Sequence, residues 1–155
     1  MNEILFFLHI ITVIAFVLGS LAIGRNALIA CICLQAVLAN LFVVQQITLF
    51  GLNVTSSDVF AVGGVLGLNL LQEYYGKQIV KKTIWISFFI MLFYLAMSQF
   101  QILYTPNSFD QTHLMFVGIL RFMPRIIIAS LIVYLIVQIL LNVFLFHFLL
   151  RRKES

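Results

Sequence analysis

The sequence predicts an all-α membrane protein, a bundle of helices that crosses a lipid bilayer several times. Of its 155 residues, 63% are hydrophobic and only 9% are charged. A soluble domain of this size leaves too much surface in contact with water to hide so many apolar side chains. The apolar residues form long unbroken runs rather than short alternating segments, which favours helices over a barrel. We therefore expect a single integral membrane domain over residues 1–155.

The apolar runs predict five membrane spans. The first run is too long for the apolar region of a signal peptide and has no basic stretch before it, so we expect it to be retained. The last apolar region, 114–150, is too long for one span, and Pro124 interrupts it because proline lacks an amide proton. A short re-entrant or interfacial segment up to Met123 is therefore expected before the last helix. The predicted spans are about Ile4–Gly24, Ala27–Phe50, Val59–Tyr75 and Thr83–Tyr104, with a long helix from Pro124 onward.

The basic residues predict how these spans are oriented. With the N-terminus outside, Arg25, the cluster Lys77–Lys82 and the terminal Arg151–Lys153 all lie in the cytoplasm. The two long loops, which carry no Lys or Arg, then lie outside, as the positive-inside rule requires. The net charge of +4 is explained by this arrangement, so we expect no nucleic-acid partner.

Polar residues in the third span are the first candidates for function. Asn69 and Glu73 are four residues apart and share one face of a helix. Gly63 and Gly67 form a pair of small residues that permits another helix to approach closely, and we expect this approach to bring the polar face against a neighbour. A structural alternative is that Glu73 forms a helical ion pair with Lys77, four residues further on.

A second polar group follows the proline break. Arg121 and Arg125 are four residues apart, and a guanidinium at membrane depth must face a cavity, a carbonyl or a carboxylate. Alternatively, both reach lipid headgroups at the outer surface. The polar residues beyond them recur every fourth position, so they bind neighbouring helices or line a solute cavity. This stripe consists of Ser130, Tyr134, Gln138 and Asn142.

Other polar residues have simpler expected roles. Gln35 and Asn40 in the second span are candidates for hydrogen bonds between helices, and Asp58 is expected to cap the N-terminus of the third. Cys31 and Cys33 point to opposite sides of a helix, which argues against a disulfide or a metal site. No nucleophile with a neighbouring base, phosphate-binding loop or zinc signature is apparent in the sequence. We therefore expect neither an enzyme nor a bound cofactor.

Two segments carry a family resemblance. The stretches "DVFAVGGVLGLNLLQEYYGKQIVKKTIWISFF" and "PRIIIASLIVYLIVQILLNVFLFHFL" resemble the bacterial queuosine precursor transporters, a family also catalogued as vitamin uptake transporters. The matching motif positions are Asn40; Glu73, Tyr75, Gly76 and Lys77; and Pro124, Arg125, Ala129, Ser130 and Gln138.

The resemblance implies uptake of deazaguanine bases, such as preQ0, preQ1 or queuine, across the bacterial inner membrane. On chemical grounds a carboxylate is the natural acceptor for the paired N–H groups of such a base, and this role falls to Glu73. Asn69 and Gln138 would complete the contact with the edge of the base, and Arg125 would donate to its carbonyl oxygen or stack on the ring. The full set of candidate substrate-binding residues is Asn40, Asn69, Glu73, Arg125, Ser130 and Gln138.

The sequence departs from the family pattern at several points. Asn69 stands where the family commonly has an aspartate, and Asn142 stands one residue beyond the usual position of an acid. The family also continues for about two more spans, whereas this sequence stops at "RRKES". We expect either a missing C-terminal part or completion by a homo-oligomer. The alternative functions are a substrate-binding membrane subunit of a multi-component vitamin transporter and a truncated helical protein that does not transport.

Overall fold

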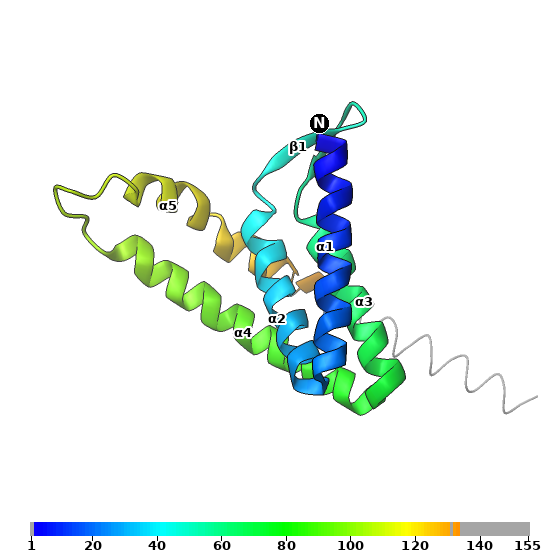
Figure 1. The fold of residues 1–155 in the computed structure, drawn as a ribbon. Coiled ribbons are helices and arrows are strands. Elements are labelled where there is room, and N and C mark those ends of the chain that lie inside the picture. Colours follow the sequence, from blue (N-terminus) through cyan, green and yellow to red (C-terminus); the bar gives the residue numbers. More distant parts are fainter. Residues whose placement is uncertain (1, 131, 134–155) are drawn as a thin grey trace, which may run out of the picture.

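The computed structural model describes residues 2–130, 132 and 133, in which helices predominate (Figure 1). One β-hairpin interrupts the helices, and a further helical stretch covers residues 123–130. In chain order the elements are α1 (Asn2–Ile23), α2 (Arg25–Phe42), β1 (Gln46–Leu49), β2 (Leu52–Thr55), α3 (Asp58–Tyr75), α4 (Lys77–Leu103) and α5 (His113–Leu120).

Single glycines separate the long helices. Gly24 joins α1 to α2 with a φ of 134°, and Gly76 joins α3 to α4 with a φ of 85°. These angles lie where only glycine is free of steric penalty, so the chain can reverse within one residue. Helix α4 begins at Lys77, six residues earlier than the predicted start at Thr83. Lysine is a good helix former, so the basic cluster forms the first turns of α4 instead of a loop before the helix.

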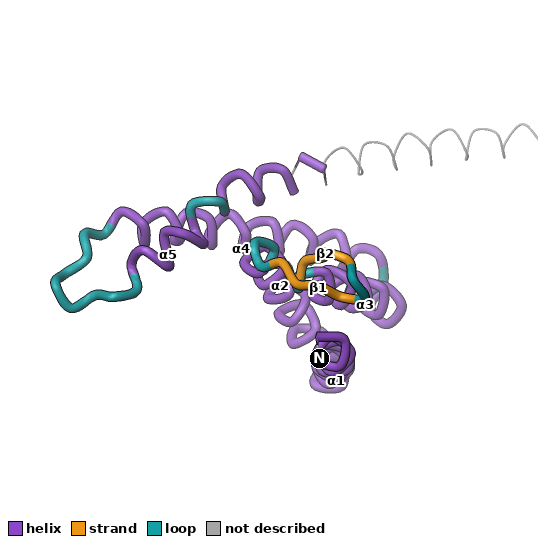
Figure 2. The backbone as a smooth tube through the Cα atoms, turned by 90° about the horizontal axis from the view of Figure 1, so that it is seen from above, coloured by secondary structure: helices purple, strands orange, loops and turns teal. Residues whose placement is uncertain are grey.

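Helices α1, α2 and α3 pack side by side around a first apolar cluster (Figures 1 and 2). Val17, Leu28 and Leu71 are completely buried there, one from each helix. The predicted close approach at the two glycines is confirmed, because a Cβ atom added at Gly67 would lie 2.7 Å from Ile32 Cγ1. A Cβ atom at Gly63 would also clash, with side chains of α1 and α2.

The close approach does not bring the polar face of α3 against a neighbour, and this prediction was wrong. Asn69 and Glu73 are both exposed within the described part of the chain. Successive residues of a helix are about 100° apart, so Asn69 lies about 200° from Gly67 and Glu73 about 240°. The glycine face and the polar face therefore point in opposite directions, although both belong to the same helix.

A β-hairpin replaces the end of the predicted second span. We expected this helix to continue to about Phe50, but α2 ends at Phe42 and the chain forms β1 and β2 over the end of the bundle (Figure 2). The two-residue turn at Phe50 and Gly51 has positive φ at both positions, 51° and 80°. This is the geometry that matches the twist of a tight hairpin. Asn2 Nδ2 donates to Thr48 O at 3.1 Å, which connects the hairpin to the start of α1.

The start of α3 also differs in detail from the prediction. Ser57, not Asp58, occupies the N-cap position, and it makes no side-chain cap hydrogen bond. Asp58 is the first residue of the helix, where its negative charge complements the helix dipole. Its carboxylate accepts a hydrogen bond of 2.9 Å from Thr55 Oγ1 and so joins the hairpin to α3.

Helix α4 diverges from the bundle, and α5 folds back along it (Figure 1). A second apolar cluster joins α4, α5 and the stretch after α5, with Met123 and Ile127 completely buried. The break predicted at Pro124 falls at residues 121 and 122, and Pro124 lies in the first turn of the next helical stretch. Proline is tolerated in a first turn because the amide that it lacks would have no helical partner.

The loop before α5 is organised by one carboxylate. Asp110 Oδ1 accepts hydrogen bonds from the backbone amide of Thr112 at 2.7 Å, from Thr112 Oγ1 at 2.9 Å and from the amide of His113 at 3.2 Å. The amide of Thr112, first among these contacts, lowers the pKa of Asp110 below its ordinary value. A carboxylate outside the helix thus satisfies donors at its first turn.

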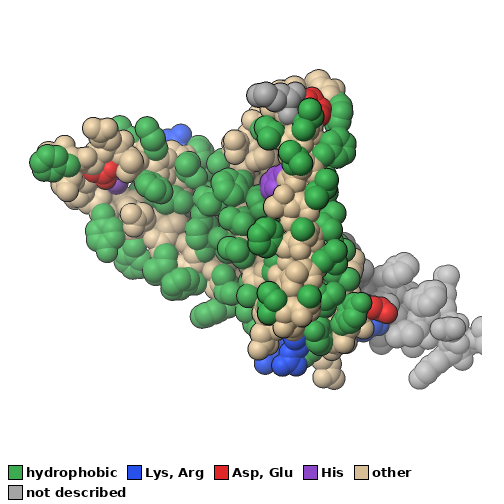
Figure 3. Space-filling view, viewed as in Figure 1, with side chains coloured by type: hydrophobic (Ala, Val, Ile, Leu, Met, Phe, Trp, Pro, Cys, Tyr) green, Lys and Arg blue, Asp and Glu red, His purple; other side chains and the backbone are tan. Residues whose placement is uncertain are grey.

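Four helical segments of the described chain are long and apolar enough to cross a membrane: α1, α2, α4 and His113–Ser130. Helix α3, which we predicted to be a span, has 18 residues but is not among these segments. It carries the polar residues Asn69, Gln72 and Glu73 in its C-terminal half. Apolar side chains cover most of the face seen in Figure 3, and basic side chains gather where α1 meets α2. The chain is an all-α, multi-pass membrane protein.

Candidate functional site

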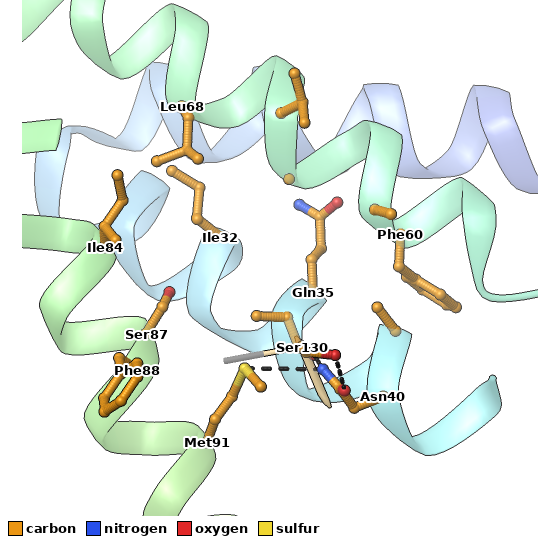
Figure 4. Close-up of a pocket in the computed structure, with 15 residues that line it drawn as sticks. Ile32, Gln35, Asn40, Phe60, Leu68, Ile84, Ser87, Phe88, Met91 and Ser130 are labelled. Carbon is orange, nitrogen blue, oxygen red and sulfur yellow. Dashed lines mark hydrogen bonds between the residues drawn. The ribbon is translucent and has the colours of Figure 1, made fainter. Parts of the chain in front are cut away.

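A cavity of about 300 Å³ lies between α2, α3 and α4, with Ser130 at its side (Figure 4). Its walls include residues of both apolar clusters, Ile32 from the first and Met91 from the second. The volume is at the lower end of the range of about 300–1,000 Å³ that is typical of small-molecule sites. Its walls are mainly apolar, and the polar side chains among them are Gln35, Asn40, Ser87 and Ser130.

Asn40 connects three parts of the chain at this cavity. Its Nδ2 donates to the carbonyl oxygen of Ala36 at 2.8 Å and lies 3.7 Å from Met91 Sδ on α4. Its Oδ1 accepts from Ser130 Oγ at 3.5 Å, across 90 residues of sequence (Figure 4). Asn40 and Ser130 were both predicted to bind substrate, and the structure brings them together.

Gln35 is more deeply buried, with 5% of its surface exposed. Its Nε2 contacts Cys31 Sγ at 3.3 Å, within the same helix. Its Oε1 is buried and accepts no hydrogen bond from the described residues. The expected bond between helices is therefore not formed there, because the amide extends toward Gly63, which has no side chain to offer a donor. Figure 4 shows the Gln35 side chain among the groups that line the cavity.

Aromatic rings form part of the cavity wall. Phe60 comes from α3 and Phe88 from α4. The ring of Phe60 stacks on Phe42, with centroids 5.8 Å apart, and His9 meets it edge-on at 4.7 Å. These contacts hold Phe60 in place from two sides. Flat rings of this kind offer apolar faces to a planar ligand.

A second polar link closes the side of the cavity toward α4. Ser87 Oγ lies 3.3 Å from Cys33 Sγ on α2, and both are at least partly buried. Sulfur is a weak acceptor, so the serine hydroxyl remains available for a stronger partner. The site can thus offer hydroxyl and amide groups from α2, α4 and the segment after α5.

The other predicted site residues do not line this cavity. Asn69, Glu73 and Arg125 are exposed in the described structure, and Gln138 lies outside the described residues. Glu73 does not form the continuous-helix pair with Lys77, because Gly76 ends α3 between them. Tyr134 and Asn142, from the polar stripe of the last helix, also lie outside the described residues.

The chemistry available at the cavity is neutral. Every described residue that lines it is uncharged at neutral pH, and the polar side-chain atoms of these residues belong to amides and hydroxyls. Within the described residues, no group of three His, Cys, Asp or Glu side chains gathers in a way that could hold a metal ion. The arrangement can bind and orient a small molecule of limited polarity, with hydrogen bonds at its edge and apolar contact on its faces.

Comparison with known proteins identifies the family of this chain. The family described as "Putative vitamin uptake transporter" matches residues 55–155, more than half of the chain. A Bacillus subtilis (strain 168) protein named "Probable queuosine precursor transporter" is 31% identical over 133 residues, or 86% of this chain. The chain spans 57% of that relative's length. No solved structure matches it. From the family match over more than half of its length, we conclude that this chain belongs to the vitamin uptake transporter family.

Proposed function

We propose that this protein takes up queuosine precursors, which are deazaguanine bases such as preQ0, preQ1 or queuine, across the bacterial inner membrane. The observation that carries the proposal is the uncharged cavity at which Asn40 meets Ser130. A planar base presents N–H donors and carbonyl acceptors at its edge, and these amide and hydroxyl groups complement both. The name of the Bacillus subtilis relative supports the same class of substrate.

The proposed binding mode uses both the edge and the faces of the base. Asn40 and Ser130 contact the edge, and the rings of Phe60 and Phe88 offer apolar contact to the faces. A site built around hydrogen bonds rejects analogues that lack the matching groups, since its own buried polar groups are then left unpaired. The cavity therefore supplies both affinity and selectivity.

The remaining candidates are proposed to contact the substrate from the exposed side of α3 and from the segment after α5. Asn69, Glu73 and Arg125 are exposed in the described chain. Charged and amide groups are costly against lipid, so we expect protein to cover them in the assembled transporter. A second copy of this chain or further spans, such as the longer relative has room for, would supply this cover. Gln138 is retained as a proposed contact from the last helix.

The proposed orientation places the N-terminus outside and the C-terminus in the cytoplasm. Arg25 and Lys82 border one shared surface hollow, at the end where α1 meets α2. The hairpin lies at the other end of α2. Basic residues remain on the cytoplasmic side of bacterial membranes, so this end is proposed to face the cytoplasm.

The test is restoration of queuosine in tRNA in bacterial cells that can neither make nor import the precursor. Cells that express this protein and receive preQ0 should recover queuosine. Asn40→Ala should lower uptake of labelled base at least tenfold, because it removes the amide from the cavity. Asn26→Ala, an exposed asparagine away from the cavity, is the matched control and should leave uptake unchanged. No restoration by wild-type protein that is present in the membrane would refute the proposal.

A further inference from the structure

A second hollow lies between the first turns of α2 and α4. Its volume is about 310 Å³, and it is lined by Arg25, Asn26 and Ile29 of α2 and by Ile79, Lys82 and Ile86 of α4. Both helices begin at the same end of the bundle, because Tyr75 at the end of α3 borders another hollow together with Gly24 and Arg25. Basic side chains gather at this end in Figure 3. Two cations from different helices therefore border one concave surface.

This hollow is separate from the cavity at Asn40. Successive residues of a helix are about 100° apart, so Lys82 lies about 200° from Ile84 and about 180° from Met91 around the axis of α4. Ile84 and Met91 line the cavity, whereas Lys82 lines the hollow. The two sites therefore lie on opposite sides of α4 and can be occupied independently.

The charge of the hollow favours an anion. Arg25 and Lys82 are exposed, and neither side chain forms a hydrogen bond or an ion pair with another described residue. The described residues that line the hollow include no carboxylate. Guanidinium and ammonium groups are the side-chain groups with which proteins commonly bind phosphate. A phosphate group can thus pair with both cations without displacing a partner within the described chain.

The remainder of the wall is largely apolar. Ile29, Ile79 and Ile86 are half-buried there. Ile29 and Ile86 each follow the basic residue of their own helix by four positions, so they lie about 6 Å further along the helix axis. The hollow is therefore charged at its mouth and apolar beyond it. This gradient fits a ligand with an anionic head and an apolar body.

The same side of α4 is the one that contacts lipid. Trp85 and Phe89 are large apolar side chains, 65% and 71% exposed in the described structure. They lie about 60° and 20° from Lys82 around the helix axis. In a membrane protein such exposed rings are covered by lipid, and tryptophan is enriched at the level of the headgroups. A lipid molecule therefore reaches this hollow from the bilayer itself.

We propose that this hollow binds an anionic phospholipid, with its phosphate between Arg25 and Lys82 and an acyl chain along Ile29 and Ile86. Basic pockets between membrane helices are suited to anionic headgroups. A zwitterionic lipid also carries a phosphate, but its own cationic group adds a like charge beside the two basic side chains. Phosphatidylglycerol, whose headgroup carries only negative charge, is therefore preferred over phosphatidylcholine. The proposal does not depend on which solute the protein transports.

Quenching of tryptophan fluorescence by brominated lipids tests the proposal, because Trp85 is the only tryptophan in the sequence. The purified full-length chain is placed in bilayers that mix phosphatidylcholine with phosphatidylglycerol, with bromine on the acyl chains of one lipid or the other. Wild type should prefer phosphatidylglycerol by roughly fivefold or more, the factor expected for one basic group at an anionic surface. The double variant Arg25→Gln with Lys82→Gln should be quenched equally by both lipids. Its thermal midpoint in phosphatidylcholine should be unchanged, because both side chains are exposed.

The matched control is the double variant Lys77→Gln with Lys81→Gln. It removes the same charge from the same end of the bundle, but neither lysine lines the hollow. This variant should keep the preference for phosphatidylglycerol. Inorganic phosphate, added at constant ionic strength, should also leave the preference unchanged, since it offers no acyl chain to the isoleucines.

Three results would overturn the proposal. Equal quenching of wild type by the two brominated lipids would show that the hollow does not select an anionic headgroup. An equal loss of preference in both double variants would show a diffuse surface potential instead of a site. Loss of the preference on addition of inorganic phosphate would identify a site for a water-soluble anion.

Discussion

Replacement of Gly67 by alanine tests whether the contact between α2 and α3 is as close as the structure shows. A Cβ atom at this position would lie 2.7 Å from Ile32 Cγ1, well inside the distance at which carbon atoms repel. The obstructing Cγ1 atom lies in the middle of the Ile32 side chain rather than at its flexible end, and Leu28 next to it is completely buried. The helices must therefore shift, or Ile32 must take an unfavourable rotamer.

The expected effect follows from two opposing terms. Alanine in place of glycine inside a helix stabilises by about 0.5–1 kcal/mol. Overpacking of a well-filled core costs about 1–3 kcal/mol. Gly19→Ala is the matched control, because nothing lies within 4 Å of its added Cβ and it receives the helix term alone. The difference between the two variants then equals the overpacking term, or roughly 2–12 °C in thermal midpoint for a chain of this size.

The assay is thermal unfolding of the purified protein in one detergent, with wild type, Gly19→Ala and Gly67→Ala measured at the same scan rate. Ile32→Ala removes the obstructing Cγ1 atom, so the double variant with Gly67→Ala should lose less stability than the two single changes together. Equal midpoints for Gly67→Ala and Gly19→Ala would refute the close contact.

Three further predictions concern the start of α5, the turn of the β-hairpin and the exposed face of α3. The pKa of Asp110 lies below its ordinary value of about 4, so its hydrogen bonds to the start of α5 should be fully present above pH 4 and should be lost as the pH falls through the lowered pKa. Amide hydrogen exchange at Thr112 should accelerate in that pH range in the wild type. The Asp110→Asn variant should lose this pH dependence. Phe50 has a φ of 51°, a left-handed angle that is costly for a residue with a side chain. The Phe50→Gly variant should therefore stabilise the hairpin by about 1 kcal/mol and slow amide exchange in its strands. The Phe50→Pro variant should disrupt the hairpin, because proline cannot adopt that angle. Glu73→Gln should reduce uptake of labelled base but leave the thermal midpoint within about 1 °C, since surface changes contribute little to stability; a large drop in the midpoint would instead indicate a structural role.

The sequence predicts the helical membrane class and the main turns well, because both depend on local composition. Long apolar runs identify the helices, and Gly76 ends α3 at the predicted place. The hairpin was missed because Ile47, Leu49 and Phe50 resume the apolar run of α2 after only two polar residues, Gln45 and Gln46. The signal that was available is the alternating, β-branched pattern on either side of the glycine turn at residues 50 and 51.

The candidate site could be predicted only in part. Asn40 and Ser130 were identified separately, and the structure adds that they meet at one cavity. The orientation of α3 could not be deduced, because both the glycine pair and the pair Asn69 and Glu73 are plausible inward faces. The close contact of Gly67 with Ile32 shows that the glycine face of α3 is the one that points into the bundle. The unpaired state of Gln35 depends on neighbours in three dimensions, so no sequence pattern could reveal it.

The position of the first two helices shows that the segment matched by the family differs from the unit that folds. The family match begins at residue 55. Leu71 lies within the matched segment and is completely buried, but the apolar cluster that surrounds it includes Val17 and Leu28, which precede residue 55. A shortened chain that started at residue 55 would leave the glycine groove of α3 facing lipid or detergent. Expression, labelling and evolutionary comparison of this protein should therefore treat its N-terminal third as belonging to the same structural unit as the remainder.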